Sequence, residues 1–457
     1  MPKTVEDKVQ SRSLAVQCQT TEWDLFDDLW NGTDAMRRAG KTWLPMEPKE
    51  TQEAYDVRLS HTFLYPGLRS AINDLTDRPF GQQISVKGTT PESLSAMLTN
   101  CDGSGSSLHN FAKAAFAMGI KRGLFHVLVD YPVVPDGASL DQDGEPYFVL
   151  IDPRQVIGWD INPQDQTLES VRIWSCETIK VGNFGEKEVE RIRVWTKSTV
   201  TVFTRQDDSD NWVQGQSVSH TFGSIPLTTT YFCKKSQMVA ERPLKDLAEV
   251  NLTHWQSSSA QRNSLRFARI GLLVARGFSQ EEYDEGFVIG PSRVIKSTNS
   301  DASIEYVEHT GKAIEIGRTD LKDLENLMEI LGVQPVLEKR QDSTATGQRI
   351  NANNEQSSLK AWIHDAEAGL RLSCEYYARW KKIELPEDWS VSIYSDFSVM
   401  ANSSDLPVLA SSRLDRQISQ RTYLDELKRR NILAATVDID KEVEETASEN
   451  MMPDVTQ

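Results

Sequence analysis

Apolar residues recur at helical spacing in the middle of the chain, and this pattern predicts two long helices separated by a β segment. In the first helix, residues 242–270, the apolar positions in step are Leu244, Leu247, Ala248, Leu252 and Trp255. In the second helix, residues 311–331, they are Ile314, Leu321, Leu324, Leu327, Met328 and Leu331. Residues 271–309 favour β structure. The chain is therefore organised around a helical hairpin whose two helices are joined through a β insert.

Proline ends the second helix and a polar crossing follows it. Pro335 lacks a backbone donor and restricts the residue before it, so the helix stops near residue 334. Residues 338–347 are polar and lead into a third helix, predicted from residue 348 to Lys382. Its apolar stripe consists of Leu359, Trp362, Ile363, Ala366, Leu370, Cys374 and Tyr377. Packing explains that stripe. The first turns are polar all round and favour a position near a channel or a subunit boundary, through Gln348, Arg349, Asn351, Asn353, Asn354, Glu355 and Gln356.

The second half of the first helix is polar at several positions. These residues are Gln256, Ser257, Ser258, Ser259, Gln261 and Asn263. They interrupt the apolar spacing, so we expect this part of the helix to face water or nucleic acid.

The N-terminal half predicts a mixed α+β lobe that ends near Val239. Residues 1–20 are polar and we expect loose order there. The apolar residues between Trp23 and Trp30 form a short amphipathic helix. Residues 52–75 have a helical pattern broken by Tyr65-Pro66-Gly67. A helix over 108–121 leads into a buried strand, and residues 146–232 are rich in β segments.

The C-terminal part predicts a strand pair and then helices. The strand pair begins at Ser390–Tyr394 and extends to Met400, and helical segments follow between Leu406 and Leu433. From Asp438 onward seven acidic residues oppose one lysine. We expect this tail to be solvated and mobile.

Composition excludes several classes of protein. The chain has 457 residues, 39% of them hydrophobic, which is enough for two or more packed lobes. Its formal net charge is −17, which argues against tight DNA binding because affinity for phosphate comes mainly from Lys and Arg. Residues 241–383 carry 19 basic and 21 acidic side chains, so the helical unit is nearly neutral. No apolar run reaches the ~18 residues of a membrane span.

Candidate catalytic and metal-binding patterns are weak. The five cysteines are scattered without a Cys-x-x-Cys pair, which fits a reducing compartment and argues against a zinc site. Asp141-x-Asp143-Gly144 lacks the further oxygen ligands of a calcium loop. His126 lies on an apolar strand and favours a core role over that of a base, and His364 favours surface pairing on its helix. We therefore expect no enzyme activity, no cofactor and no metal.

Several local motifs, in a fixed order, resemble the portal proteins of tailed bacteriophages. The matching segments between Trp23 and Met400 are Gly32–Gly40 with Trp43–Pro45, Arg122–Pro132, Asp246–Asn251, Glu305–Ile314 and Ser343–Thr346. Each motif is short, and the specificity lies in their order along the chain. The resemblance implies an α+β, portal-like subunit.

The resemblance assigns a role to each part of the chain. Residues 1–240 correspond to a mixed wing, 241–270 and 311–334 to the two stem helices, and 271–310 to a small β clip. Residues 335–347 correspond to the tunnel loop, 348–404 to a long wing helix with strands, and 405–457 to a helical crown with an acidic tail. The implied assembly is a ring, typically of twelve identical chains, at one vertex of the virion capsid, built in the host cytoplasm.

The implied function is a conduit and docking platform. Double-stranded DNA passes through such a ring without sequence specificity during packaging by a terminase and during ejection. Head-completion or tail adaptor proteins and the major capsid protein are the further partners, and a membrane is not. A closed ring requires heterologous contacts, in which one face of each chain meets a different face of its neighbour.

Two sets of site residues follow from this reading. Lys339, Arg340 and Arg349 lie in or beside the polar crossing and are the candidates for phosphate contacts in the channel. Ion pairing with Glu338, Asp342 or Glu355 is their alternative role. The candidates for partner docking on the clip are Phe278, Tyr283, Phe287, Val288, Ile289 and Tyr306. Formation of the clip's own small core is the alternative for these six.

Two other classes of protein compete with this reading. An enzyme with a helical insertion predicts a pocket with convergent polar groups and turnover by the pure chain. A capsid-associated adaptor or scaffold without a channel predicts binding to capsid protein but no central hole.

Overall fold

The structure of the chain is a computed structural model whose contacts divide it into two units, Met1–Ile393 and Tyr394–Gln457. It describes residues 8–131, 145–206, 211–270, 272–281, 299, 301–307, 311–335, 357–395, 406–429, 432–433 and 437–449. Helices and strands are mixed in the first unit, which confirms the predicted α+β class.

Five short N-terminal helical segments pack against the rest of the first unit. They are α1 (Leu14–Asn31), α2 (Thr33–Ala39), the 3-10 turn η1 (Gly40–Thr42), α3 (Gln52–His61) and α4 (Gly67–Asp77). Helix α1 begins well before Trp23, so the expectation of loose order is wrong for residues 14–20. Ser13 caps α1 by accepting a hydrogen bond from the Val16 amide, and Val16 is buried with Trp23.

The predicted interruption at Pro66 is a complete break between α3 and α4. Thr62, which follows α3, is extended, with φ −76° and ψ 137°. Pro66 lacks the amide hydrogen that a continuous helix would use, and α4 restarts at Gly67. The break leaves the backbone of residues 62–66 free for tertiary hydrogen bonds.

A small antiparallel sheet lies at the centre of the first unit. Strand β2 (Leu124–Asp130) is buried throughout and lies between β3 (Tyr147–Ile151) and β9 (Leu227–Tyr231). Helices α6 (Leu108–Arg122) and α11 (Ser358–Trp380) pack on this sheet. Gly369 allows the close approach of α11, because a Cβ there would collide with Thr230 on β9.

A second sheet is a five-stranded antiparallel meander in sequence order. Its strands are β4 (Val156–Ile161), β5 (Leu168–Val181), β6 (Gly185–Thr196), β7 (Thr199–Arg205) and β8 (Trp212–Ser219). Val171, Ile173 and Trp195 from this meander share a buried cluster with Leu128 of β2, so the two sheets have a common core.

Short elements complete the first unit. They are α5 (Glu92–Thr99), the 3-10 turn η2 (Pro153–Gln155), and the pairs β1 (Ser85–Lys87) with β14 (Ser390–Ser392) and β10 (Lys234–Ser236) with β11 (Val239–Ala240). The predicted strand at Ser390 therefore pairs with a segment about 300 residues earlier in the chain.

An ionic cluster ties α1 to α6 and η2. Asp27 accepts from Lys121, Arg122 and Arg154 at 2.6, 3.0 and 2.5 Å, and Arg122 also pairs with Asp152 at 2.8 Å. Burial opposes ionisation of Asp27, but the charges of Arg122 and Lys121 overcome it and hold the pKa of Asp27 below its ordinary value.

The third predicted helix starts later than expected. Ser357 is extended, with φ −63° and ψ 154°, and its side chain accepts from the Lys360 amide, so α11 begins at Ser358. A continuous helix from residue 348 to Lys382 is therefore wrong. Residues 348–356 lie outside the described part of the chain.

The second unit contains the helices α12 (Leu406–Leu414), α13 (Gln420–Arg429) and α14 (Ile439–Glu449). The tail expected to be mobile is helical over α14. The Asp438 side chain accepts from the amides of Asp440 and Lys441, and Arg421 of α13 pairs with Asp440 at 3.2 Å.

Candidate functional site

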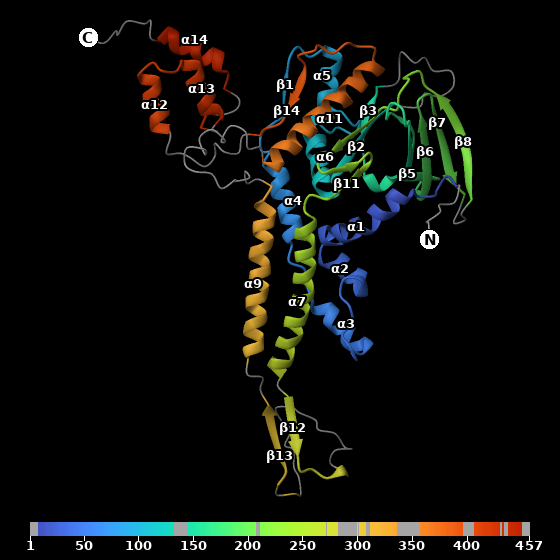
Figure 1. Ribbon diagram of the computed structural model, residues 1–457, viewed down its shortest axis with the longest axis vertical. Coiled ribbons are helices and arrows are strands. Elements are labelled where there is room, and N and C mark those ends of the chain that lie inside the picture. The colour runs from blue at the N-terminus through green and yellow to red at the C-terminus, as the bar shows by residue number, and fades with distance from the viewer. Residues whose placement is uncertain are drawn as a thin grey trace. The chain divides into compact units, whose positions relative to one another are not determined.

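The predicted helix–β–helix arrangement is present in the first unit. Helix α7 (Lys245–Ile270) leads to β12 (Leu272–Arg276), and β13 (Ser303–Val307) leads back to α9 (Lys312–Val333). Figure 1 shows the two helices side by side, with the strand pair at one end. At 1.5 Å per residue, α7 is about 39 Å long and α9 about 33 Å.

The strands are antiparallel and in register. Leu272 is opposite Val307, and Arg276 is opposite Ser303. The strand pair thus continues the hairpin that the helices begin. We call α7, β12, β13 and α9 together the stem hairpin.

A buried asparagine joins the stem hairpin to the body of the first unit. Asn251 on α7 is 1% exposed. Its Oδ1 accepts from the Leu68 amide and its Nδ2 donates to the Tyr65 carbonyl, both at 2.9 Å. These are backbone groups at the break between α3 and α4. Asn251 therefore uses the polar groups that the break exposes to fix the position of α7.

Polar contacts also join the two stem helices. Gln261 Nε2 of α7 donates to the Ile314 carbonyl of α9 at 2.7 Å. Gly317 lies so close to Gln261 that a Cβ at this position would collide with the Gln261 side chain. Farther from the strand pair, His254 Nε2 of α7 pairs with Glu325 Oε1 of α9 at 3.3 Å. The hairpin is thus held in one register by polar contacts at two levels.

The sequence predicted that the polar residues in the second half of α7 face water or nucleic acid. In the structure, two of them are buried. Ser258 is 4% exposed and Ser259 is fully buried. Ser259 Oγ accepts from Thr62 Oγ1 at 3.0 Å and from Arg58 at 3.3 Å, which brings the end of α3 onto α7. The expectation of a water-facing or DNA-facing surface is wrong for these serines, because both are buried and Ser259 is covered by Arg58 and Thr62.

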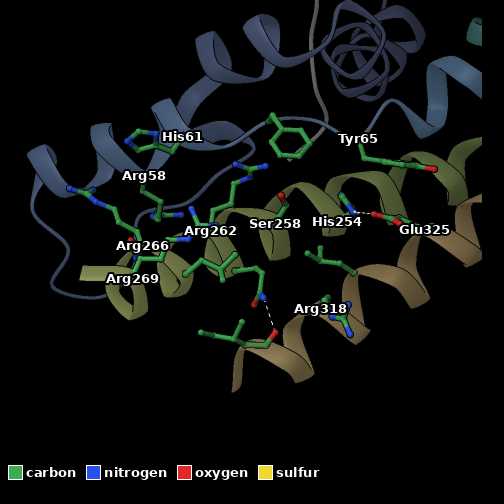
Figure 2. A pocket seen from close by; sticks show the side chains of 16 residues that line it. Arg58, His61, Tyr65, His254, Ser258, Arg262, Arg266, Arg269, Arg318 and Glu325 are labelled. Atoms are coloured by element: carbon green, nitrogen blue, oxygen red, sulfur yellow. Dashed lines mark hydrogen bonds and ion pairs between the residues drawn. The ribbon is translucent and has the colours of Figure 1, made fainter. Parts of the chain in front are cut away.

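A basic cleft lies where α3, α7 and α9 meet. The cavity is about 660 Å³ and is lined by Arg58, His61, Phe63, Arg262, Arg266, Arg269 and Arg318, among others (Figure 2). Arg58 and Arg318 are neutralised within the chain, by Glu50 at 2.7 Å and Glu315 at 2.5 Å. The remaining positive charge of the cleft belongs to three arginines of α7.

These three arginines are differently placed. The guanidinium of Arg262 lies 3.8 Å from the centre of the Phe63 ring. Desolvation, and then the charge of Arg269, lowers the pKa of Arg262. Arg266 and Arg269 are exposed, and neither forms an ion pair with any residue that the structure describes. The cleft therefore has unused capacity for a negatively charged partner.

Few of the sequence-predicted site residues can be placed. Lys339, Arg340 and Arg349 lie outside the described residues, as do Tyr283, Phe287, Val288 and Ile289. Phe278 is half-buried just beyond β12, and Tyr306 pairs with Leu273 in the β12–β13 ladder. The basic cleft was missed, although Arg262, Arg266 and Arg269 have the spacing of one helix face.

The isolated histidines have the structural roles expected. His126 is 1% exposed, its Nδ1 is 2.9 Å from Thr229 Oγ1, and burial lowers its pKa to about 3. His364 is exposed and pairs with Glu367 at 3.3 Å.

Other kinds of site were sought in the described residues. There, no group of three or more His, Cys, Asp or Glu side chains comes together in a way that could hold a metal ion. The five cysteines are free thiols. None of the described helices combines the length and apolarity required to span a bilayer.

Comparison with known proteins gives one family match and several structural similarities. A family model described as a domain of unknown function (DUF4055) matches residues 243–381, from the start of α7 to the end of α11. No curated protein matches the sequence.

Three similar solved structures come from gene transfer agent particles. One chain from the neck of the empty particle, computed with C6 symmetry, is 12% identical with a TM-score of 0.42, over 85% of this chain and 91% of that one. One from the neck of the native particle, computed with C12 symmetry, is 12% identical with a TM-score of 0.41, over 79% and 88%. A chain from the native virion is 11% identical with a TM-score of 0.39, over 91% and 99%.

Replacing Asn251 with alanine tests the anchor of the stem hairpin. The change leaves two buried backbone groups without partners, so we expect the free energy of unfolding to fall by about 2–4 kcal/mol. Urea denaturation with an unchanged m-value measures this loss. The control is Asn326→Ala on the exposed face of α9, which we expect to change stability by less than about 0.5 kcal/mol. Equal effects of the two variants would contradict the anchoring role.

A second prediction concerns the pH dependence of the hairpin. Burial, the largest influence, lowers the pKa of His254 below its ordinary value of 6.5, against the opposing effects of Glu325 and Asp320. The unfolded chain therefore takes up a proton on this residue at higher pH than the folded chain does. The contribution of neutral His254 to stability is complete above pH 6.5 and declines as the pH falls below it.

The measurement is the thermal unfolding midpoint at pH 7.5 and pH 5.0. We expect a smaller loss of stability on acidification in His254→Gln than in the natural chain. His61→Gln, a change at an exposed histidine lining the same cleft, is the control and retains the natural loss. An identical pH response in all three chains would show that His254 does not contribute.

Proposed function

We propose that this chain is the subunit of a ring-shaped head–tail connector, a portal, in a phage-like particle. The observation that supports the proposal is the stem hairpin: two long antiparallel helices anchored at one end to an α+β body and joined at the other by a strand pair. Copies of such a hairpin, set side by side around an axis, form a wall of helices. The order of parts is that of the portal family that the sequence resembles.

The role is structural rather than catalytic. The ring is a channel for double-stranded DNA, which a terminase drives in during packaging and which leaves at ejection. The net charge of −17 on each chain suits passage without tight binding, because many phosphate contacts would hinder the sliding of DNA. Twelve copies form the ring in this proposal, and it sits at one vertex of the capsid.

Specific segments have specific roles in this proposal. The loop of residues 335–347, with Lys339 and Arg340 in it and Arg349 beside it, reaches the channel and contacts phosphates. The strand pair with Phe278 and Tyr306, together with the segment that contains Tyr283, Phe287, Val288 and Ile289, is the docking surface for head-completion or tail proteins. The capsid protein surrounds the assembled ring.

Electron microscopy of the purified full-length chain tests the proposal. We expect class averages of a closed ring with a central hole wide enough for a DNA duplex, about 20 Å. A monomer or dimer at every concentration would overturn the proposal. Association with capsid protein without a hole would instead indicate an adaptor or scaffold.

The channel loop has its own test. Replacing Lys339, Arg340 and Arg349 with glutamine removes three positive charges, so we expect rings of natural size with altered packaging or retention of DNA. Ring size is measured by electron microscopy and packaged DNA by nuclease protection. Unchanged packaging would remove these residues as functional contacts.

A further inference from the structure

One face of α7 carries a stripe of positive charge. From Val250 to Ile270 the helix contains three arginines and no carboxylate. Arg262, Arg266 and Arg269 follow one another in steps of four and three residues, so they lie on one side of α7 over about 10 Å. We call these three residues the basic stripe. They line the cleft together with Phe63, whose apolar ring is 44% exposed.

The outward face of α9 carries a stripe of opposite character. Its exposed members, in alternating steps of four and three residues, are Ile316, Asp320, Asp323, Leu327 and Ile330. Ile316 and Ile330 are 70% and 63% exposed, an unusual state for two large apolar side chains on one helix face. We call this set the acidic stripe. Its spacing is that of a helix seam that packs against another helix.

The two stripes do not meet within one chain. Helix α9 uses a different face, including the buried Met328 and the Ile314 carbonyl, to contact α4 and α7. Within the described residues, neither Asp320 nor Asp323 forms an ion pair, and the same holds for Arg266 and Arg269. Among the described residues, the stem hairpin therefore carries complementary charges that are not paired with each other.

We infer that the acidic stripe of one copy docks into the basic cleft of the next copy around the ring. Asp320 and Asp323 pair with Arg266 and Arg269, while the flanking apolar side chains contact Phe63 and the apolar wall of the cleft. The contact is heterologous, since a different face of each chain takes part, and it repeats from copy to copy. The inference rests on the proposed ring and specifies which faces close it.

A nucleic acid is a weaker candidate for the same cleft. Phosphates satisfy the arginines but leave the acidic stripe, with its exposed isoleucines, uncovered. A second copy of the chain covers both surfaces in one contact. Five carboxylates on α9, against three basic side chains, also give this helix the net negative charge that the cleft requires.

Charge reversal on each face provides the test. Variant one is Arg266→Glu with Arg269→Glu, and variant two is Asp320→Arg with Asp323→Arg. We expect each purified variant to lose the ring observed for the natural chain, because every interface then brings like charges together. An equal mixture of the two restores rings, since each interface again pairs opposite charges. Lys322→Glu is the control: it lies about 100° around α9 from Asp323 and leaves rings intact.

The outcomes separate this inference from the proposed function. Loss of rings in each variant, with recovery in the mixture, supports the docking and shows that both variants are folded. Rings of natural size from either variant alone would overturn the docking while leaving the proposed function in place. Rings that form normally but lose DNA in variant one would assign the cleft to DNA and overturn the docking. Absence of rings from the natural chain would reject the proposed function itself.

Discussion

The architecture depends on how the backbone groups exposed by the helix break at Pro66 find hydrogen-bond partners. A helix that stops inside a protein exposes backbone amides and carbonyls that must find partners. Here the Asn251 side chain supplies one donor and one acceptor to these groups from the first turns of α7. Asn251 consequently links the α3–α4 break directly to α7. The contacts of Ser259 with Thr62 and Arg58, and the packing of α9 on α4, complete the attachment of the stem hairpin to the body.

Charge is distributed so that the stem hairpin and the body differ. The strongly negative charge of the chain lies mostly outside residues 241–383. Among the described residues, Arg266 and Arg269 of α7 form no ion pairs across the seam with Asp320 and Asp323 of α9. That seam is held by neutral amides and by His254 with Glu325, which leaves the charged faces available for contacts outside the chain.

Local signals in the sequence were sufficient for the stem helices and for α11, because a 3.6-residue apolar period is visible without tertiary information. The interruption at Pro66 was also predicted correctly, because a proline without an amide hydrogen is itself a local signal. Contacts between segments far apart in the chain could not be predicted from local sequence patterns. The burial of Ser259 depends on α3, and the basic cleft combines residues 58–63 with residues far away on α7 and α9. Ser13 and Ser357, both helix caps, were the local signals that went unused.

The levels at which α7 and α9 are joined have a geometric consequence. Gln261 lies opposite Ile314 and His254 opposite Glu325, so the basic stripe is about 15 Å nearer the strand pair than the acidic stripe. A closed ring repeats by rotation without any rise along its axis. For the two stripes to meet between neighbours, each hairpin must be tilted sideways, towards its neighbour, relative to the ring axis. Leaning helices enclose a waisted opening, and the width of that waist then depends on the angle of lean.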